Sequence, residues 1–570
     1  MLSSLPGTSE ELLGWGWAPI EAYYRALQTW PLSVGNVEEW LDAWTRVNDL
    51  LAEARARLYL ATVRDTTDVE AERRYHAFLD TIVPPMEAAD QALKEKLLAS
   101  GLEPAGLEVA LRNMRAESDL FRVANLPLMT EEHKLASRFN KIVGAQTVEW
   151  DGKELTLPQL GPYFQTHDRD TRERIWRLAT QRQLADRQAI DTLWTEFMAL
   201  RGQIAANAGR PDYRAYRWQQ QLRFDYTPAD AAHFQEAIAQ VAVPAAARIY
   251  ERHRRRLDVP ALRPWDVIED RYPLRLPALR PFGAGSELER VGARIFECVD
   301  PQLGEYFEIM CREGLLDLEN RKGKGPGAFC TAFDAIRRPF IFMNAVGSHD
   351  DVQTLLHEAG HAFHVFETAH LPYFQHAQIG MEFLEVASMA MELLAMPYLA
   401  ASNGGFYSDA EAARAHVEHL EHIILFWPYM AVVDAFQHWV YENHAAATNP
   451  ANCDAKWAEL WQRFMPGVDW SGLEAEMMTG WHRKRHIHRS PFYYIEYGLA
   501  QLGAVQVWRN AREDQAGAVA RYRHALSLGG TVPLPELYAA AGARFAFDAG
   551  TLQSAVTLVE ETIAELEDGL

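Results

Sequence analysis

Apolar residues recur along most of this chain at the three- and four-residue intervals of an amphipathic helix. Long stretches with this pattern and few glycines or prolines cover residues 37–62, 66–100 and 105–120, and the pattern returns at 411–446 and 551–567. Side chains three and four positions apart share one face of a helix, so each stretch is predicted to be a helix that buries one side. We therefore expect a mainly α-helical protein.

Shorter segments break the helical pattern and predict β-structure. Residues 148–157 are expected to form a hairpin, because Asp151 and Gly152 at their centre are the dipeptide that favours a type I′ turn. The apolar runs at 328–333 and 340–343 are predicted to be strands of a small sheet. The proline- and arginine-rich segment 257–287 is expected to be a loop or a boundary between lobes.

Composition narrows the class of protein. At 570 residues the chain exceeds a single hydrophobic core, and 48% apolar with 24% charged residues is ordinary for a soluble globular protein. A net charge of −22 argues against nucleic-acid and membrane partners. We expect no signal peptide and no membrane span. Four cysteines without C-x-x-C spacing indicate reduced thiols, so we expect a cytoplasmic protein.

The pentapeptide His357-Glu358-Ala359-Gly360-His361 carries the most specific chemistry. Two histidines four positions apart share one helix face, where both can bind one metal ion. The glutamate between them is placed to act as general base on a metal-bound water, the arrangement of a zinc peptidase.

The surrounding residues predict the helix that this motif needs. Ser348 and Asp351 form a capping signature, so a helix is expected to begin near His349. One stripe of this helix is apolar and is expected to be buried: Val352, Leu355, Leu356, Ala359, Phe363 and Phe366. His357, His361 and His364 fall on the opposite side. The alternative is an ordinary solvated polar face.

A catalytic zinc needs a third protein ligand, and segment 381–396 is the best source. It has the composition of a buried helix, with Glu382, Glu385, Ser388 and Glu392 on one narrow polar stripe. A carboxylate on a buried helix needs a cation or hydrogen-bond donors. Periodicity alone does not choose among the three glutamates, and pairing with arginines is the alternative to a metal.

The segment Phe383-Leu384-Glu385-Val386-Ala387-Ser388 resembles the second signature of the thimet oligopeptidase and oligoendopeptidase F family of zinc peptidases. Similar segments occur at 321–327 and 338–345. The segment 491–497 resembles the tyrosine-rich substrate segment of the oligoendopeptidase F and Pz-peptidase branch. Many family members have proline where this chain has Ala387.

The resemblance implies the remaining site residues. Glu385 becomes the third ligand of one Zn²⁺ per chain, and Glu392 a residue that can orient a ligand histidine. His486, Tyr494 and Tyr497 would stabilise the negative charge on the carbonyl oxygen during hydrolysis. The register leaves His488 open in place of His486 and Tyr493 in place of Tyr494. Without the family, residues 492–497 would be interpreted as an aromatic core patch.

By the same resemblance the fold has two helical lobes flanking a deep cleft, with a small sheet beside the zinc helix. We expect an N-terminal helical region at 1–175, including the hairpin, and a zinc metallopeptidase catalytic region at 176–570. A peptide can add as a strand at the edge of the sheet, although a plain core hairpin is the alternative for 328–343.

The predicted function is zinc-dependent oligoendopeptidase, hydrolysing internal bonds of short unfolded peptides. Two alternatives stay open. One is a metallocarboxypeptidase with the same zinc chemistry, and the other is a non-catalytic helical binding protein.

Overall fold

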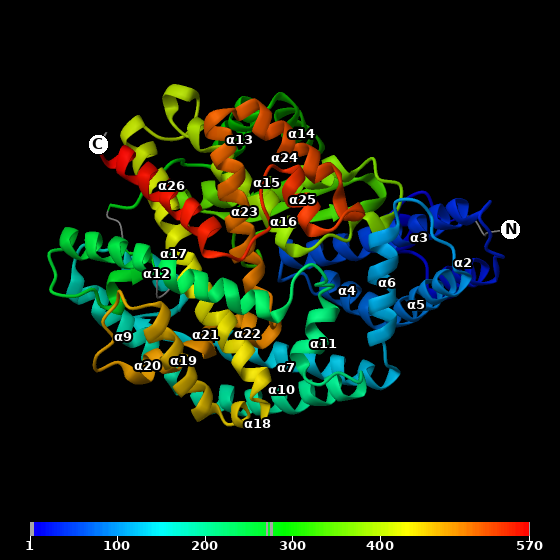
Figure 1. The fold of residues 1–570 in the computed structure, drawn as a ribbon, viewed down its shortest axis with the longest axis horizontal. Coiled ribbons are helices and arrows are strands. Elements are labelled where there is room, and N and C mark those ends of the chain that lie inside the picture. Colours follow the sequence, from blue (N-terminus) through cyan, green and yellow to red (C-terminus); the bar gives the residue numbers. More distant parts are fainter. Residues whose placement is uncertain (1–4, 269–271, 274–276, 569–570) are drawn as a thin grey trace. The chain divides into compact units, whose positions relative to one another are not determined.

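The chain folds mainly into α-helices, in a computed structural model that describes residues 5–268, 272–273 and 277–568. It divides into two compact units, each assembled from three separate stretches of sequence. The first unit contains the residues up to 119, residues 279–412 and residues 503–545. The second contains residues 120–278, residues 413–502 and the residues from 546 onward. The mainly helical class predicted from the sequence is confirmed (Figure 1).

Helices from the N-terminal part of the chain give the first unit a tryptophan-rich core. They are α1 (Ser9–Leu12), α2 (Trp17–Thr29), α3 (Val37–Arg64), α4 (Val69–Thr81), α5 (Val83–Ser100) and α6 (Glu108–Leu120). Trp40 and Trp44 of α3 are fully buried in this core. The helical stretch 66–100 forms two helices, with Pro84 and Pro85 in the first turn of α5. Proline can begin a helix, but it cannot donate the backbone hydrogen bond that would continue one.

A three-stranded sheet lies in the middle of the first unit. Its strands are β5 (Leu316–Glu319), β6 (Phe329–Phe333) and β7 (Arg338–Ala345), in the order β5-β7-β6. The central strand β7 pairs parallel with β5 and antiparallel with β6. The strands predicted at 328–333 and 340–343 are confirmed, and β6 forms one edge of the sheet.

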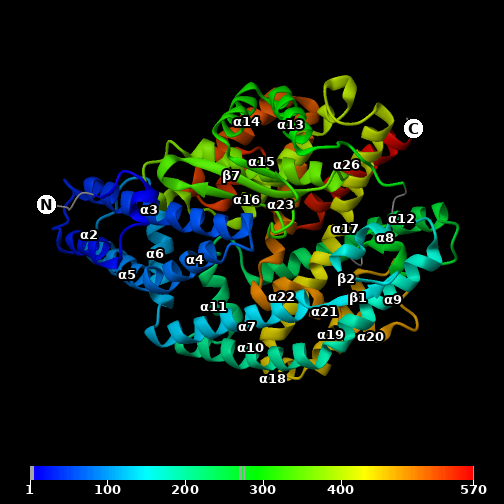
Figure 2. The same cartoon turned by 180° about the vertical axis from the view of Figure 1, so that it is seen from behind.

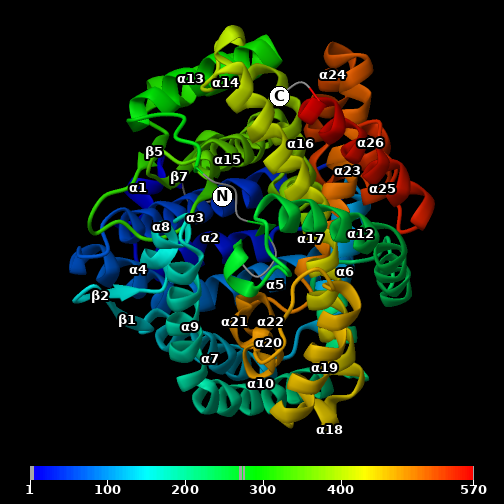
Figure 3. The ribbon, with the colours of Figure 1, turned by 90° about the vertical axis from the view of Figure 1, so that its left-hand side faces the viewer.

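Helices complete the first unit around the sheet. They are α13 (Gly285–Val299), α14 (Pro301–Glu313), α15 (His349–Thr368), α16 (Met381–Leu394), α24 (Gln515–Ser527) and α25 (Leu534–Ala540). The predicted apolar stripe of α15 is buried along its whole length. Phe363 meets Phe296 of α13 with ring centroids 5.1 Å apart, and Phe366 stacks on Tyr306 of α14 at 4.6 Å. Figures 2 and 3 show the sheet between α15 and α3.

The second unit consists mostly of long helices. They are α7 (Leu126–Gly144), α8 (Gly161–Phe164), α9 (Arg169–Ala185), α10 (Arg187–Asn207), α11 (Tyr213–Gln220), α12 (Pro228–Arg256), α18 (His444–Ala447), α19 (Pro450–Phe464), α20 (Glu474–Met478), α21 (Gly480–Arg483), α22 (Arg485–Arg489), α26 (Ala549–Asp568), most of α17 (Asp409–Glu442) and the first part of α23 (Tyr494–Glu513). Residues 409–412 of α17 and 503–513 of α23 belong to the first unit. Buried Trp427 of α17 donates a hydrogen bond to the Gly498 carbonyl of α23 at 3.0 Å.

The predicted hairpin is present in the second unit. Strands β1 (Thr147–Trp150) and β2 (Lys153–Thr156) pair antiparallel. Asp151 and Gly152 between them have φ angles of 49° and 71°. Positive φ at both central positions is the requirement of a type I′ turn, so this prediction is confirmed.

The segment 257–287 contains the point at which the chain passes from the second unit to the first, between residues 278 and 279. Its described part includes the strand pair β3 (Val267–Ile268) and β4 (Tyr272–Pro273), which the loop prediction did not anticipate. Residues 269–271 and 274–276 of the predicted loop lie outside the described residues. The division into regions 1–175 and 176–570 remains a prediction, and its boundary falls within α9.

Among the described residues, one helix is long and apolar enough to cross a membrane by length and composition. It is α17, and 83% of its most apolar window is buried inside the protein. Burial of this extent is the pattern of a core helix.

Candidate metal centre

Helix α15 presents the two histidines of the pentapeptide from a well-defined start. The Ser348 side chain accepts the Asp351 N–H at 3.3 Å, and the Asp351 carboxylate accepts the Ser348 N–H at 2.8 Å. This reciprocal capping box begins the helix at His349, as predicted. The register of α15 then places its apolar stripe in the core and His357 and His361 on one other face.

Gly360 allows α16 to lie against that face of α15. A Cβ atom on Gly360 would lie 2.4 Å from the Ala387 carbonyl oxygen and 2.6 Å from the Ser388 Cα. Real Cβ atoms do not approach a backbone this closely, so any larger residue would push the two helices apart. The sequence analysis did not single out this glycine, although it stands inside the motif.

The close approach of the helices brings three metal-binding side chains together. The Glu385 carboxylate oxygen Oε2 lies 3.4 Å from His357 Nε2 and 3.7 Å from His361 Nε2. One ligand atom from each residue lies within 4.8 Å of the others. Zinc bonds of about 2.0–2.2 Å in tetrahedral geometry require ligand atoms roughly 3.3–3.6 Å apart. Both carboxylate–imidazole distances lie close to this range, so the three groups suit a single zinc ion after small adjustments of the side chains.

Neighbouring groups fix the orientation of these side chains. Glu392 accepts a hydrogen bond from His357 Nδ1 at 2.6 Å, which leaves Nε2 as the atom facing Glu385. The Ser388 hydroxyl donates to the Glu385 carboxylate at 3.1 Å and to its own helix at the Glu385 carbonyl. A carboxylate on the second nitrogen of a ligand histidine is a common support of metal sites. The contact expected between Glu392 and one of the candidate ligand histidines is present, and its orienting role remains a prediction.

Burial and charge separate the proton affinities of the three groups. Burial lowers the pKa of His361 to about 4, against the opposing charge of Glu385. Burial would lower the pKa of His357 as well, but hydrogen bonds to Glu385 and Glu392 raise it well above its ordinary range. Burial raises the pKa of Glu385, but the hydrogen bond from His357 and the charges of His361 and His357 outweigh it and hold that pKa at about 2. The cluster therefore contains a carboxylate that stays ionised and favours a cation.

Glu358 lies beside this cluster but faces the sheet. Its side chain is only 7% exposed, and burial raises the pKa of its carboxyl to about 7, partly offset by the charge of His357. The backbone N–H of Cys330 in β6 donates a hydrogen bond to this carboxylate. A carboxyl group with a pKa near neutrality can accept and release a proton at physiological pH.

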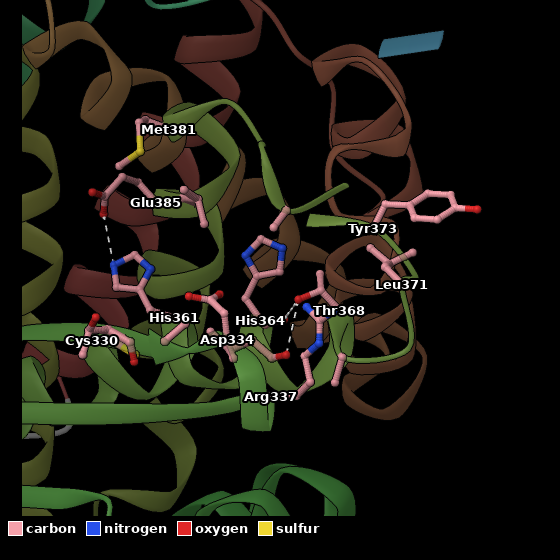
Figure 4. A pocket seen from close by; sticks show the side chains of 16 residues that line it. Cys330, Asp334, Arg337, His361, His364, Thr368, Leu371, Tyr373, Met381 and Glu385 are labelled. Carbon is pink, nitrogen blue, oxygen red and sulfur yellow. Dashed lines mark hydrogen bonds and ion pairs between the residues drawn. The ribbon is translucent and has the colours of Figure 1, made fainter. Parts of the chain in front are cut away.

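A cavity of about 380 Å³ opens next to the cluster (Figure 4). His361 and Glu385 form one end of its wall, and Cys330 to Ala332 of β6 form one side. The remaining wall is mixed: Val365, Leu371, Tyr373, Met381 and Leu384 contribute apolar surface, and Asp334, Arg337, His364 and Thr368 contribute polar groups. The cluster is therefore reachable from a space large enough for a side chain.

The predicted charge-stabilising residues lie in the second unit, whereas the metal-binding cluster lies in the first. His486 is half-buried, and its ring lies within 6.1 Å of the rings of Tyr493, Tyr494 and Tyr497. Lys484 donates a hydrogen bond to the Tyr494 hydroxyl at 2.7 Å. The role of His486, Tyr494 and Tyr497 at the site remains a prediction.

The structure does distinguish the two alternative histidines by burial. His488 is fully buried within the second unit, stacked on Phe139 with ring centroids 4.3 Å apart. The His488 ring is therefore less accessible to a substrate than the half-buried His486 ring. His486 is the better candidate for that reason, while half-buried Tyr493 and buried Tyr494 both stay open.

Comparison with known proteins gives the family. Peptidase family M3 matches residues 163–557 of this chain. The chain belongs to peptidase family M3. The resemblance stated from the two signatures is thereby confirmed, and it extends to solved structures. Pz peptidase A, solved with an inhibitor, superposes with a TM-score of 0.87 at 28% identity, over 99% of this chain and 98% of that one.

Two curated relatives match over shorter stretches. An oligoendopeptidase F homolog of Borreliella burgdorferi is 23% identical over 47% of this chain and 45% of its own length. Oligopeptidase PepF of Bacillus subtilis is 23% identical over 52% of this chain and 44% of its own length. The chain thus aligns with a little under half the length of these relatives.

Proposed function

We propose that this chain is a zinc-dependent oligoendopeptidase that hydrolyses internal bonds of short, unfolded peptides in the cytoplasm. The convergence of His357, His361 and Glu385, with Glu358 between them and the edge strand β6, carries this proposal. Membership of peptidase family M3 and the likeness to an oligoendopeptidase F homolog support peptides as substrates. The four cysteines are all free, which is typical of a reducing compartment.

His357, His361 and Glu385 would hold the zinc ion, with Glu392 and Ser388 keeping two of them in orientation. A bound zinc ion supplies a Lewis acid that polarises a peptide carbonyl and makes water more acidic. The fit rests on the ligand spacing and on the ionised Glu385.

Glu358 would act as the general base and then as the general acid. Its carboxylate would accept a proton from the attacking water and return it to the leaving amine nitrogen. The Cys330 N–H holds this carboxylate in place, and burial brings its pKa close to neutrality. His486, Tyr494 and Tyr497 would donate hydrogen bonds to the carbonyl oxygen as it becomes negative.

The substitution Glu358→Gln tests the mechanism. We expect the variant to retain zinc in metal analysis while peptide turnover falls roughly 10²- to 10⁴-fold, because the amide cannot accept the proton. Glu39→Gln, the same change at an exposed position of α3, is the matched control and should keep full activity. Unchanged turnover in Glu358→Gln would refute the assignment.

A peptide blocked at both ends separates internal cleavage from removal of terminal residues. An oligoendopeptidase cleaves it, whereas a metallocarboxypeptidase needs a free C-terminus and leaves it intact. Mass spectrometry of the products identifies the bond that is cut. Cleavage of the unblocked peptide alone would favour the carboxypeptidase.

A further inference from the structure

The outer edge of β6, the side not paired with β7, lies next to the metal-binding cluster. In the central strand β7, the Ile341 N–H points towards β5 and donates a hydrogen bond to the carbonyl of Leu315, the residue just before β5, at 3.0 Å. Alternate residues of a strand point to opposite sides, so Phe340 and Phe342 face β6 and pair there with Thr331 and Phe329. Cys330 and Ala332 lie between these pairs. Their backbone N–H and C=O groups therefore point to the outer edge, where the Cys330 N–H meets the Glu358 carboxylate. The Cys330 carbonyl and both backbone groups of Ala332 are the ones that an added chain would pair with.

The two faces of β6 are covered by different helices. Phe329 and Phe333 lie on the face towards α3, where the Tyr59 ring is 5.7 Å from the Phe329 ring and Arg57 lies 4.1 Å from the centre of the Phe333 ring. Cys330 and Ala332 lie on the opposite face, towards α15. There, burial and then the nearby charge of Glu358 raise the pKa of the Cys330 thiol. A chain added at the edge of β6 would project its side chains alternately towards α15 and towards α3.

A cavity lies on each of these two sides. The α15-side cavity is the space of about 380 Å³ next to His361 and Glu385. The α3-side cavity is a second space, of about 440 Å³, formed by residues of α3, α4 and α5. Both cavities share Thr331, Ala332 and Asp334. The edge of β6 is therefore the line along which they meet.

Part of the wall of the α3-side cavity is apolar and aromatic, from Leu51, Ala56, Tyr59, Tyr75 and Phe78. Asn48, Arg55 and Asp334 contribute polar groups to the rest of the wall. Tyr59 is 41% exposed, although its ring also contacts the Tyr75 ring at 5.8 Å. Exposed aromatic surface in a concave site is buried when an apolar side chain enters, and this burial favours binding.

We propose that the α3-side cavity is a subsite for a large aliphatic or aromatic side chain of the peptide substrate. This inference rests on the proposed function and adds a substrate preference to it. Cys330 of β6 lies at the metal-binding cluster, and each residue of an extended chain advances about 3.3 Å. A peptide paired with residues 330–333 therefore places a side chain in this cavity within three residues of the cleaved bond, on one side of that bond.

Most of the wall of this subsite comes from outside the part of the chain that the family model matches, whereas Thr331, Ala332 and Asp334 lie inside it. Helices α3, α4 and α5 end at Ser100, whereas the family match begins at residue 163. The α3-side cavity would thus be a specificity element formed largely by the N-terminal helices, which also have counterparts in Pz peptidase A because that structure covers 99% of this chain. It is distinct from the metal chemistry, so it can be altered without changing a metal-binding group.

The test is to fill the cavity and measure which peptides are still cut. Ala56→Trp places an indole in the α3-side cavity, and Ala61→Trp places the same group on an exposed position of α3 outside the cavity. The substrates are peptides that differ only in carrying leucine, phenylalanine or glycine at successive positions around one cleavable bond. The measured quantity is kcat/KM for each peptide, with circular dichroism to verify folding.

For each position we compare kcat/KM of the leucine or phenylalanine peptide with kcat/KM of the glycine peptide. We expect Ala56→Trp to lower this ratio at least about tenfold at one position, which lies within three residues of the cleaved bond. Ala61→Trp should leave this ratio unchanged. Tyr75→Ala, which enlarges the cavity, should raise the ratio for phenylalanine relative to leucine at the same position.

Two outcomes would overturn the subsite. One is a ratio that Ala56→Trp leaves unchanged at every position, and the other is an equal loss for all peptides in a folded variant. Failure of the wild-type protein to cut any peptide, with zinc bound, would instead refute the proposed function. The two inferences can therefore fail separately.

Discussion

Replacing Gly360 with alanine tests whether the spacing of α15 and α16 creates the metal centre. The added Cβ would lie 2.4 Å from the Ala387 carbonyl oxygen, about 1 Å closer than an ordinary contact. The helices must therefore separate by about 1 Å, which moves Glu385 away from nitrogens that now lie 3.4 and 3.7 Å from its carboxylate. Overpacking of this kind lowers the free energy of unfolding by about 1–3 kcal/mol. The preference of a helix for alanine over glycine, roughly 0.5–1 kcal/mol, offsets part of this loss.

Zinc titration by calorimetry and thermal unfolding followed by circular dichroism measure the two consequences. We expect the zinc dissociation constant to rise about 10- to 100-fold, as when a supporting group of a metal site is lost, and the unfolding midpoint to fall. Gly144→Ala in α7 is the matched control, because a Cβ there meets no atom within 4 Å. An unchanged affinity and midpoint in Gly360→Ala would show that the helix spacing does not determine the site.

Three further predictions concern the support of His357, an ion pair of β5 and the need for metal. Glu392→Ala removes the acceptor 2.6 Å from His357 Nδ1, so zinc affinity measured by calorimetry should fall about 10- to 100-fold; an unchanged affinity would contradict the orienting role. Asp317→Asn removes the carboxylate 2.8 Å from the buried Lys324 ammonium and should destabilise the first unit by on the order of 3 kcal/mol at pH 7 in denaturant titrations. Although burial opposes them, hydrogen bonds from Arg321 and Lys324 hold the pKa of Asp317 at about 2, so the stabilisation is present above about pH 4 and is lost as the pH falls towards 2. The difference in free energy of unfolding between Asp317→Asn and the wild type should therefore decrease as the pH falls from about 4 towards 2. A difference that stays constant over this range would refute the ion pair as the source of the stabilisation. Removal of metal with a chelator should abolish peptide hydrolysis and added zinc should restore it; full activity in metal-free protein would contradict the proposed function.

The sequence predicted α15, the helix that carries the two candidate ligand histidines, because the signals for this helix are local. Ser348 and Asp351 mark its start, and the apolar stripe from Val352 to Phe366 determines which face is buried. The position of both histidines on another face follows from the helical repeat alone. No knowledge of the neighbouring elements was needed for these conclusions.

The third ligand shows where local signals end. Glu382, Glu385 and Glu392 share one stripe of α16, and periodicity left all three open. The helix crossing separates them, because Glu385 meets both histidines at Nε2 while Glu392 reaches His357 Nδ1. That crossing depends on the contact of Gly360 with Ala387 and Ser388, which are distant in sequence.

The alternative histidines and the α3-side cavity depend on tertiary structure in the same way. His486 and His488 have the same sequence context, and only packing on Phe139 shows that His488 is enclosed. The α3-side cavity joins helices that end at Ser100 to a strand that begins at Phe329. No periodic pattern within either segment indicates that they meet.

Anomalous diffraction at the zinc absorption edge, from crystals grown with zinc, tests the central claim most directly. The account predicts one strong peak in the first unit, about 2.0–2.2 Å from His357 Nε2, His361 Nε2 and a Glu385 carboxylate oxygen. A map with no peak among these three side chains, or with its peak at other residues, would contradict it.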